Sequence, residues 1–101
     1  MPTNTISLSG SNVLYNVDFD IGGFQFNVDG ATVTGTSGGD AAAAGFTVQG
    51  AGNTVLGFSF TGSTIPAGCG VLTELSLSGD AMSLSGIVFS DATGTAIDVF
   101  Y

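Results

Sequence analysis

Hydrophobic residues alternate with polar ones over most of this chain, the pattern of β-strands that have one buried and one wet face. The longest alternating run covers residues 12–21. Because ten residues is long for a strand, we expect this run to bend or to carry a bulge before Gly22-Gly23 ends it. Its apolar positions are Val13, Tyr15, Val17, Phe19 and Ile21.

Shorter runs follow, separated by glycine, asparagine and aspartate, which favour turns. The last two runs are predicted to form a hairpin around residues 91–94, with Gly94 at a positive φ. In the run 54–61, one face carries Leu56, Phe58 and Phe60. In the run 71–77, the expected inward positions are Val71, Thr73, Leu75 and Leu77. The expected strands cover residues 3–8, 12–21, 24–29, 31–34, 45–49, 54–61, 71–77, 84–90 and 95–101.

One segment has helical character, the run Asp-Ala-Ala-Ala-Ala at residues 40–44. Asp40 suits the N-cap of a helical turn. Five residues are too few for a helix that is stable alone, so we expect a loop or a 3₁₀ turn. Eight or nine short strands, separated by turns about every 8–12 residues, predict an all-β antiparallel sandwich. We expect one domain that spans residues 1–101.

The charged residues exclude several classes of function. The chain has eight Asp and Glu residues and no lysine, arginine or histidine. It has no cationic side chain to pair with nucleic-acid phosphates or an anionic membrane surface. It has no histidine or lysine to activate a serine nucleophile, and no imidazole to hold a transition metal. No apolar run approaches the roughly 20 residues that span a bilayer. We therefore expect a non-enzymatic protein that neither binds nucleic acid nor inserts into a membrane.

Asp18 and Asp20 are the most suggestive pair of carboxylates. On one strand face they would lie about 6–7 Å apart, a spacing that overlaps the acid/base pair of an inverting glycosidase. A hydrolase needs one carboxyl with a pKa raised by burial, whereas this face is predicted to be solvated. Their oxygens suit calcium, although no D-x-D-x-D-G loop is present. We predict no catalytic residue, no metal ligand and no cofactor, and calcium remains an open alternative.

Cys69 and the tyrosines carry the remaining chemistry. As the only cysteine, Cys69 has no internal disulfide partner. It is expected to be an inert thiol, or else a link between copies of the chain. Tyr15 and Tyr101 are candidate platforms for stacking on sugars. Tyr15 shares a face with Val13 and Val17, however, so we predict that it belongs to the core, as do most of the phenylalanines.

Three stretches in order resemble cohesin-type domains, and the compact cohesin-like modules of marine secreted and viral proteins. They are VDFDIGGFQF at residues 17–26, VLGFSF at 55–60 with IPAGCGVL at 65–72, and GIVFSDATGTAI at 86–97. The resemblance covers residues 12–101. It implies a nine-stranded jelly-roll sandwich without catalysis. Cohesins bind calcium-loaded dockerin helices on one sheet face, but this chain has Val28-Asp29-Gly30 where the family has tyrosine, aspartate and proline.

We therefore expect a non-catalytic, cohesin-like module for protein–protein interaction or adhesion, on a secreted or virion-surface protein. It would present one polar sheet face or a sheet edge to a protein or polysaccharide. A carbohydrate-binding module of a polysaccharide-acting protein is one alternative, which an exposed Tyr15 would favour. A self-assembling structural subunit is another, joined through edge strands at residues 3–8 or 96–101. The expected binding residues are Asn16, Asp18, Asp20, Gln25 and Asn27.

Overall fold

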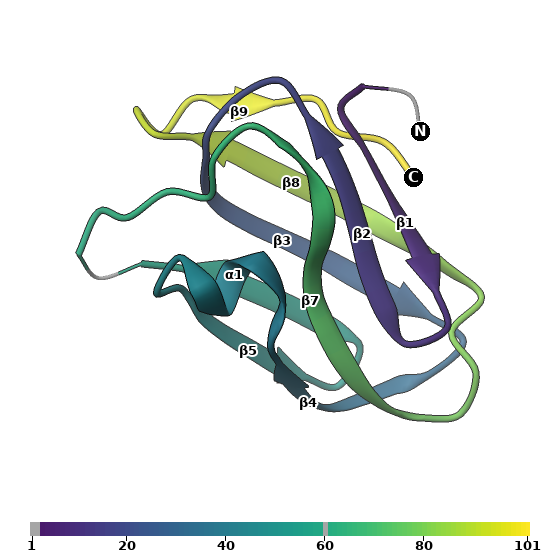
Figure 1. The fold of residues 1–101 in the computed structure, drawn as a ribbon. Helices are drawn as coiled ribbons and strands as arrows, with labels where there is room; N and C mark the ends of the chain where they lie inside the picture. Colours follow the sequence, from purple (N-terminus) through teal and green to yellow (C-terminus); the bar gives the residue numbers. More distant parts are fainter. Residues whose placement is uncertain (1–2, 60) are drawn as a thin grey trace.

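Two antiparallel β-sheets pack face to face in the computed structural model, which describes residues 3–59 and 61–101 (Figure 1). The four-stranded sheet has the order β1-β2-β7-β4 and the five-stranded sheet has the order β5-β6-β3-β8-β9. The predicted all-β antiparallel sandwich is therefore confirmed. The four-stranded sheet contains β1 (Thr5–Ser9), β2 (Asn12–Val17), β4 (Thr32–Ser37) and β7 (Gly68–Ser78). The five-stranded sheet contains β3 (Ile21–Asp29), β5 (Thr47–Ala51), β6 (Thr54–Phe58), β8 (Ser83–Asp91) and β9 (Ala96–Ile97).

The expected single strand over residues 12–21 is wrong, because the chain changes sheets in the middle of it. β2 ends at Val17 in one sheet and β3 begins at Ile21 in the other. Apolar alternation continues through the change because Val17 and Ile21 both point into the core, where they are 3% and 0% exposed. The expected break at Gly22-Gly23 is also wrong, since both glycines lie inside β3. A Cβ at Gly22 would lie 2.3 Å from the carbonyl oxygen of Asp91, so only glycine fits there.

The core is built by the inward faces of both sheets, and phenylalanine rings fill its centre. The Phe24 ring stacks with three others, at centroid distances of 5.7 Å to Phe89 and 6.1 Å to Phe26 and to Phe46. Gly57 on β6 leaves room for this ring, because a Cβ there would lie 2.2 Å from Phe24 Cζ. The buried face of β6 is therefore Val55 and Gly57, and the face of Leu56 is turned to solvent. Phe60 lies outside the described residues.

The segment at residues 40–44 is a short helix, α1 (Gly39–Ala43), so the expected loop or 3₁₀ turn is wrong. Asp40 does not cap it, because the N-cap is Gly38 and no side chain makes the cap bond. The helix persists as a single turn because tertiary contacts hold it: Ala41 is fully buried, and α1 packs against β7 and β5.

β7 extends beyond the predicted residues 71–77 to Gly68–Ser78. Thr73 and Leu75 are buried as predicted, whereas Val71 and Leu77 are half-buried. Leu72 is buried too, although alternation alone would turn it outward. The reason is a bulge: the pairing of β2 with β7 shifts between Val13 and Leu14, and both Leu72 and Thr73 then face inward.

The predicted C-terminal hairpin is present, with Gly94 at φ 85°, but its second strand is much shorter than expected. β9 has two residues and pairs only with Phe89 and Ser90 of β8. The chain then returns to the four-stranded sheet, where Phe100 pairs in parallel with Thr5. Figure 1 shows this segment ending beside β1, so that both termini lie at the same side of the sandwich. We call residues 98–101 the C-terminal tail.

Candidate functional site

The outer face of the five-stranded sheet presents a flat row of side chains that carry no charge. Gln25 on β3 lies opposite Leu56 on β6 and Val88 on β8, and all three are exposed. Leu56 is 40% and Val88 54% exposed, which is high for large aliphatic side chains. The row continues to Gln49 on the edge strand β5. We call Gln25, Leu56, Val88 and the outward residues around them the neutral face.

Two further rows flank this one and complete the neutral face. On one side Asn27 lies between Thr54 and Ser85. The Thr54 hydroxyl donates a hydrogen bond of 2.9 Å to Oδ1 of Asn27, which fixes the orientation of the amide. On the other side Gly23 lies between Phe58 and Ser90. The missing side chain leaves a shallow hollow of about 320 Å³ that is bordered by Leu56, Phe58 and Val88.

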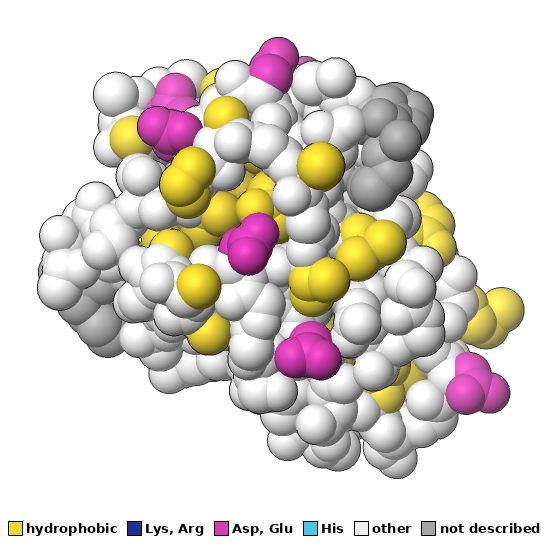
Figure 2. All heavy atoms as spheres, in the orientation of Figure 1, with side chains coloured by type: hydrophobic (Ala, Val, Ile, Leu, Met, Phe, Trp, Pro, Cys, Tyr) yellow, Lys and Arg dark blue, Asp and Glu magenta, His cyan; other side chains and the backbone are white. Residues whose placement is uncertain are grey.

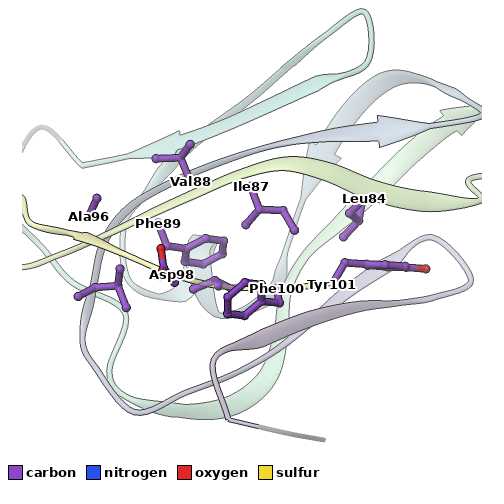
Figure 3. Close-up of a pocket in the computed structure, with 10 residues that line it drawn as sticks. Leu84, Ile87, Val88, Phe89, Ala96, Asp98, Phe100 and Tyr101 are labelled. Carbon is purple, nitrogen blue, oxygen red and sulfur yellow. The ribbon is translucent and has the colours of Figure 1, made fainter.

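A bulge in β8 brings Val88 to the neutral face. The pairing of β3 with β8 shifts between Gln25 and Asn27, which lie opposite Val88 and Ser85. Gly86 within the bulge has φ 58°, a left-handed conformation that glycine adopts at little cost. A Cβ at this position would lie 2.8 Å from Nδ2 of Asn27. The extra residue places Val88 outward, between the inward-facing Ile87 and Phe89 (Figure 3).

Carboxylates lie at the ends of the neutral face and not in its centre. Asp29 ends β3, where it accepts hydrogen bonds from the hydroxyls of Ser83 and Ser85 at 2.8 and 3.0 Å. Asp91 ends β8, and the hydroxyl of Thr93 donates to it at 2.7 Å. That bond, together with backbone donors from the same turn, lowers the pKa of Asp91. On the side of the molecule in view in Figure 2, acidic side chains are scattered among neutral ones.

The structure brings together only two of the five predicted binding residues. Gln25 and Asn27 both lie on the neutral face. Asn16 lies on β2 of the four-stranded sheet, opposite Thr5 and Cys69. Asp18 and Asp20 lie in the connection that carries the chain from one sheet to the other. The separation follows from the sheet change after Val17, which places the polar side chains of β2 and β3 on opposite outer surfaces of the sandwich.

Sequence reasoning missed Leu56 and Val88, because it looked for binding residues among the polar side chains of the strands. The signal for Leu56 is the neighbouring Gly57, since a glycine opposite a core phenylalanine marks the inward position of that strand. The signal for Val88 is Gly86, which precedes three consecutive apolar residues and so indicates a bulge.

Asp18 and Asp20 are both exposed and each takes part in local backbone contacts. Oδ1 of Asp20 accepts a hydrogen bond of 3.0 Å from the backbone N–H of Ala67. The backbone N–H of Asp18 donates to Oδ1 of Asn4 at 3.2 Å. Within residues 3–59 and 61–101, no three side chains of the Asp, Glu, His and Cys types group closely enough to hold a metal ion.

Tyr15 is 3% exposed, which confirms that it belongs to the core and removes it as a sugar-stacking platform. Its hydroxyl donates a hydrogen bond of 2.5 Å to Oδ2 of Asp40 on α1. Burial, and then this bond to a carboxylate, raise the pKa of Tyr15 well above its ordinary value. Cys69 is an exposed free thiol and lines a hollow of about 450 Å³ beside Tyr15 and Asp40.

No helix in the described part of the chain is long and apolar enough to cross a lipid bilayer. Comparisons with models of protein families, with curated proteins and with solved structures found no match to this chain.

Proposed function

We propose that this protein is a non-catalytic, cohesin-like interaction module of a secreted or virion-surface protein, and that it docks a partner protein on the neutral face. The observation that carries the proposal is the row of Leu56, Gln25 and Val88. In a protein of net charge −8, this row joins two exposed aliphatic side chains to an uncharged amide. Depletion of charge around apolar anchors is the compositional signature of an interface core.

The dimensions of the face suit a helical partner, as the resemblance to cohesins implies. Leu56, Gln25 and Val88 lie on three neighbouring strands, so the row spans two strand spacings, about 10 Å. An α-helix with its side chains has a diameter of about 10–12 Å. A helix laid across this row would cover both aliphatic side chains and the Gln25 amide between them, and would leave the amide of Asn27 at its flank. The face lies on paired strands, so binding costs little ordering of the backbone.

The strand arrangement supports the jelly-roll that the resemblance implies. In residues 3–59 and 61–101, nine strands form the two layers, and the chain passes between the sheets after β2, β3, β4, β6 and β7. Within this described part, only the hairpins β1–β2, β5–β6 and β8–β9 join neighbours in the same sheet. Repeated crossing of this kind is characteristic of double-sheet jelly rolls.

A protein partner is favoured over a polysaccharide by the placement of the aromatic side chains. Sugar recognition of the expected kind needs exposed aromatic rings in a row. Tyr15 is buried, and Phe100 and Tyr101, which are 62% and 54% exposed, belong to the C-terminal tail and not to the neutral face. The aromatic residue on the neutral face, Phe58, is half-buried.

Titration calorimetry with a purified calcium-loaded dockerin, alongside a glycan array with and without calcium, tests the proposal. We expect the dockerin to bind and Val88→Asp to weaken binding by at least about tenfold, since it places a charge at an interface core. Ser76→Asp is the matched control, because Ser76 is exposed on β7 in the other sheet. If Val88→Asp leaves dockerin binding intact, the dockerin does not bind on the neutral face. Specific glycan retention without dockerin binding would replace the proposal with the carbohydrate-binding alternative.

A further inference from the structure

The outer edge of β8 lacks a partner strand over most of its length. β9 pairs with Phe89 and Ser90 alone, and on the other side β8 pairs with β3. Among residues 3–59 and 61–101, no strand pairs with residues 83–88 on the side that faces away from β3. Six residues of open strand extend over about 20 Å. Such an edge offers backbone donors and acceptors to an incoming strand.

An apolar trough runs beside this open edge. Leu84, Ile87 and Phe89 point from β8 toward Phe100 and Tyr101 of the C-terminal tail, whereas Val88 points to the opposite side of the strand (Figure 3). Together with Val99, these side chains border a hollow of about 480 Å³. The trough is therefore lined by apolar groups from β8 on one wall and from the tail on the other.

A second hollow, of about 680 Å³, lies on the other side of Tyr101 toward the four-stranded sheet, and most of its lining is polar. Its apolar residues include Leu8, Leu75, Leu77 and Met82. Met82 is 78% exposed, and with Phe100 and Tyr101 it makes this end of the sandwich the place where large exposed apolar side chains gather. Exposed apolar surface with a polar rim is typical of an interaction site.

The acidic side chains beside the two hollows indicate the kind of partner that binds there. Asp98 lines the first hollow and Asp80 lines the second. The chain contains no lysine, arginine or histidine to pair with either carboxylate. A second copy of the chain would bring eight further negative charges and no positive one. Complementarity therefore favours a cationic occupant over self-association.

We propose that a basic, extended peptide segment of another protein adds to β8 as a further strand. Its backbone would hydrogen-bond to residues 83–88 and its alternate apolar side chains would enter the trough, while lysine or arginine side chains at the two ends of the segment would reach Asp98 and Asp80. This site shares β8 with the neutral face, because Val88 also borders the first hollow, but the side chains that line the trough lie on the other side of the strand.

Fluorescence anisotropy tests the proposal with a labelled peptide of about eight residues that has valine at alternate central positions, threonine between the valines and lysine at both ends. We expect saturable binding that weakens as salt rises, because the charge term is screened. A peptide with glutamate in place of lysine should bind at least about tenfold more weakly. Asp98→Asn should weaken the lysine peptide about two- to fivefold, as for one exposed ion pair. The matched control, Glu74→Gln, removes the same charge on β7 and should leave binding unchanged.

Two further variants separate this site from the neutral face. Phe100→Asp should reduce binding at least about tenfold, because it removes an apolar wall of the trough and the entering valines would have to strip water from the new carboxylate. Leu56→Asp, on the neutral face, should have no effect. If Phe100→Asp unfolds the protein, Asp98→Asn still decides the outcome, and hydrogen exchange of residues 83–88 supplies an independent readout. We expect the lysine peptide to slow exchange of these amides.

Three results would overturn the proposal. Equal binding of the glutamate and lysine peptides would remove the charge argument. Loss of peptide binding in Leu56→Asp with full binding in Phe100→Asp would place the peptide on the neutral face. Concentration-dependent dimers in sedimentation, with residues 83–88 protected in the absence of peptide, would make a second copy the occupant.

Discussion

The two lateral sides of the sandwich are closed in different ways. On one side, β4 and β5 lie against each other across the sheets: the N–H of Val33 donates to the carbonyl of Gly52 at 2.7 Å, and the hydroxyl of Thr36 donates to the carbonyl of Val48 at 2.8 Å. On the other side, β1 and β8 make only a few contacts, and the C-terminal tail lies beside β1. The N–H of Ile6 donates to the carbonyl of Phe100 at 2.8 Å, and the N–H of Phe100 donates to the carbonyl of Asn4 at 3.0 Å. The hydroxyl of Tyr101 donates to the carbonyl of Met82 at 3.4 Å.

The difference shows how sheet edges can be protected in a protein without basic residues. Many proteins protect an edge strand with lysine, which this chain lacks. On the β4–β5 side, the edge strands of the two sheets are joined by hydrogen bonds to each other. The β1–β8 side covers one edge with a short tail and leaves most of the other open. We infer that the first side serves stability and that the second is available for binding.

Gly50→Ala should give the largest loss of stability, because it disturbs the close packing of β5 against β4. A Cβ at Gly50 would lie 2.5 Å from Cγ1 of Val33, and the branched valine has little freedom to move away. We expect a loss of about 1–3 kcal/mol in the free energy of unfolding, measured by chemical denaturation. Gly35→Ala is the control, because a Cβ there would meet Ser76 at an ordinary 3.7 Å. Equal effects of the two changes would mean that close approach of β4 and β5 is unimportant.

Val99→Ala should weaken the β1–β8 side by about 1–2 kcal/mol, from the buried methyl groups it removes. Val99 is 6% exposed and anchors the tail. We expect the loss to be local, so that hydrogen exchange of Ile6 and Phe100 quickens more than exchange of the β3 amides. A uniform rise in exchange across both sheets would contradict the view that the tail opens independently.

Tyr15→Phe should cost about 1 kcal/mol at neutral pH, because it removes the bond that ties β2 to α1 while half-buried Asp40 keeps access to water. The native state raises the pKa of Tyr15, so it retains the proton at a pH where the unfolded chain, with a pKa of about 10, has lost it. The wild-type protein should therefore lose stability as pH rises above about 10, by up to roughly 1.4 kcal/mol per pH unit. Denaturation curves across this range should show a smaller loss for Tyr15→Phe.

Asp91→Asn should have the smallest effect and concerns the turn that holds β9 against β8. Thr93 and the backbone of the turn lower the pKa of Asp91, so its contribution is present above the unfolded value near 4 and is lost as pH falls through the native value. The amide of Thr95, which donates to Asp91 at 3.0 Å, should lose protection in acid in the wild type. In Asp91→Asn this loss should disappear, and an unchanged acid profile would show that other groups govern the turn.

Alternation predicted the sandwich well, because burial of one strand face is a local property of sequence. The inward positions Phe24, Phe26 and Val28, and the turn at Gly94, are found where expected. Alternation could not reveal that the chain changes sheets after Val17, since a strand that leaves one sheet for the other keeps the same face toward the shared core.

The candidate site was less predictable because its key features are set by pairing between distant strands. Leu56 faces outward because Phe24 needs the space above Gly57, and Val88 does so because of a bulge opposite Asn27. Asn16 and Gln25 each lie on the polar face of an alternating strand, and alternation does not tell which sheet each strand joins. The open edge of β8 depends on where β9 ends, which the sequence around Asp98 does not define.

The parallel pairing of the tail with β1 has a mechanical consequence. The bond from Ile6 to Phe100 and the bond from Phe100 to the carbonyl of Asn4 lie side by side between the first and last segments of the chain. Force applied through the two ends would slide these segments past each other and load both bonds at once, instead of unzipping them in turn. The two hydrogen bonds that hold the tail to the N-terminal segment would therefore share a pulling force.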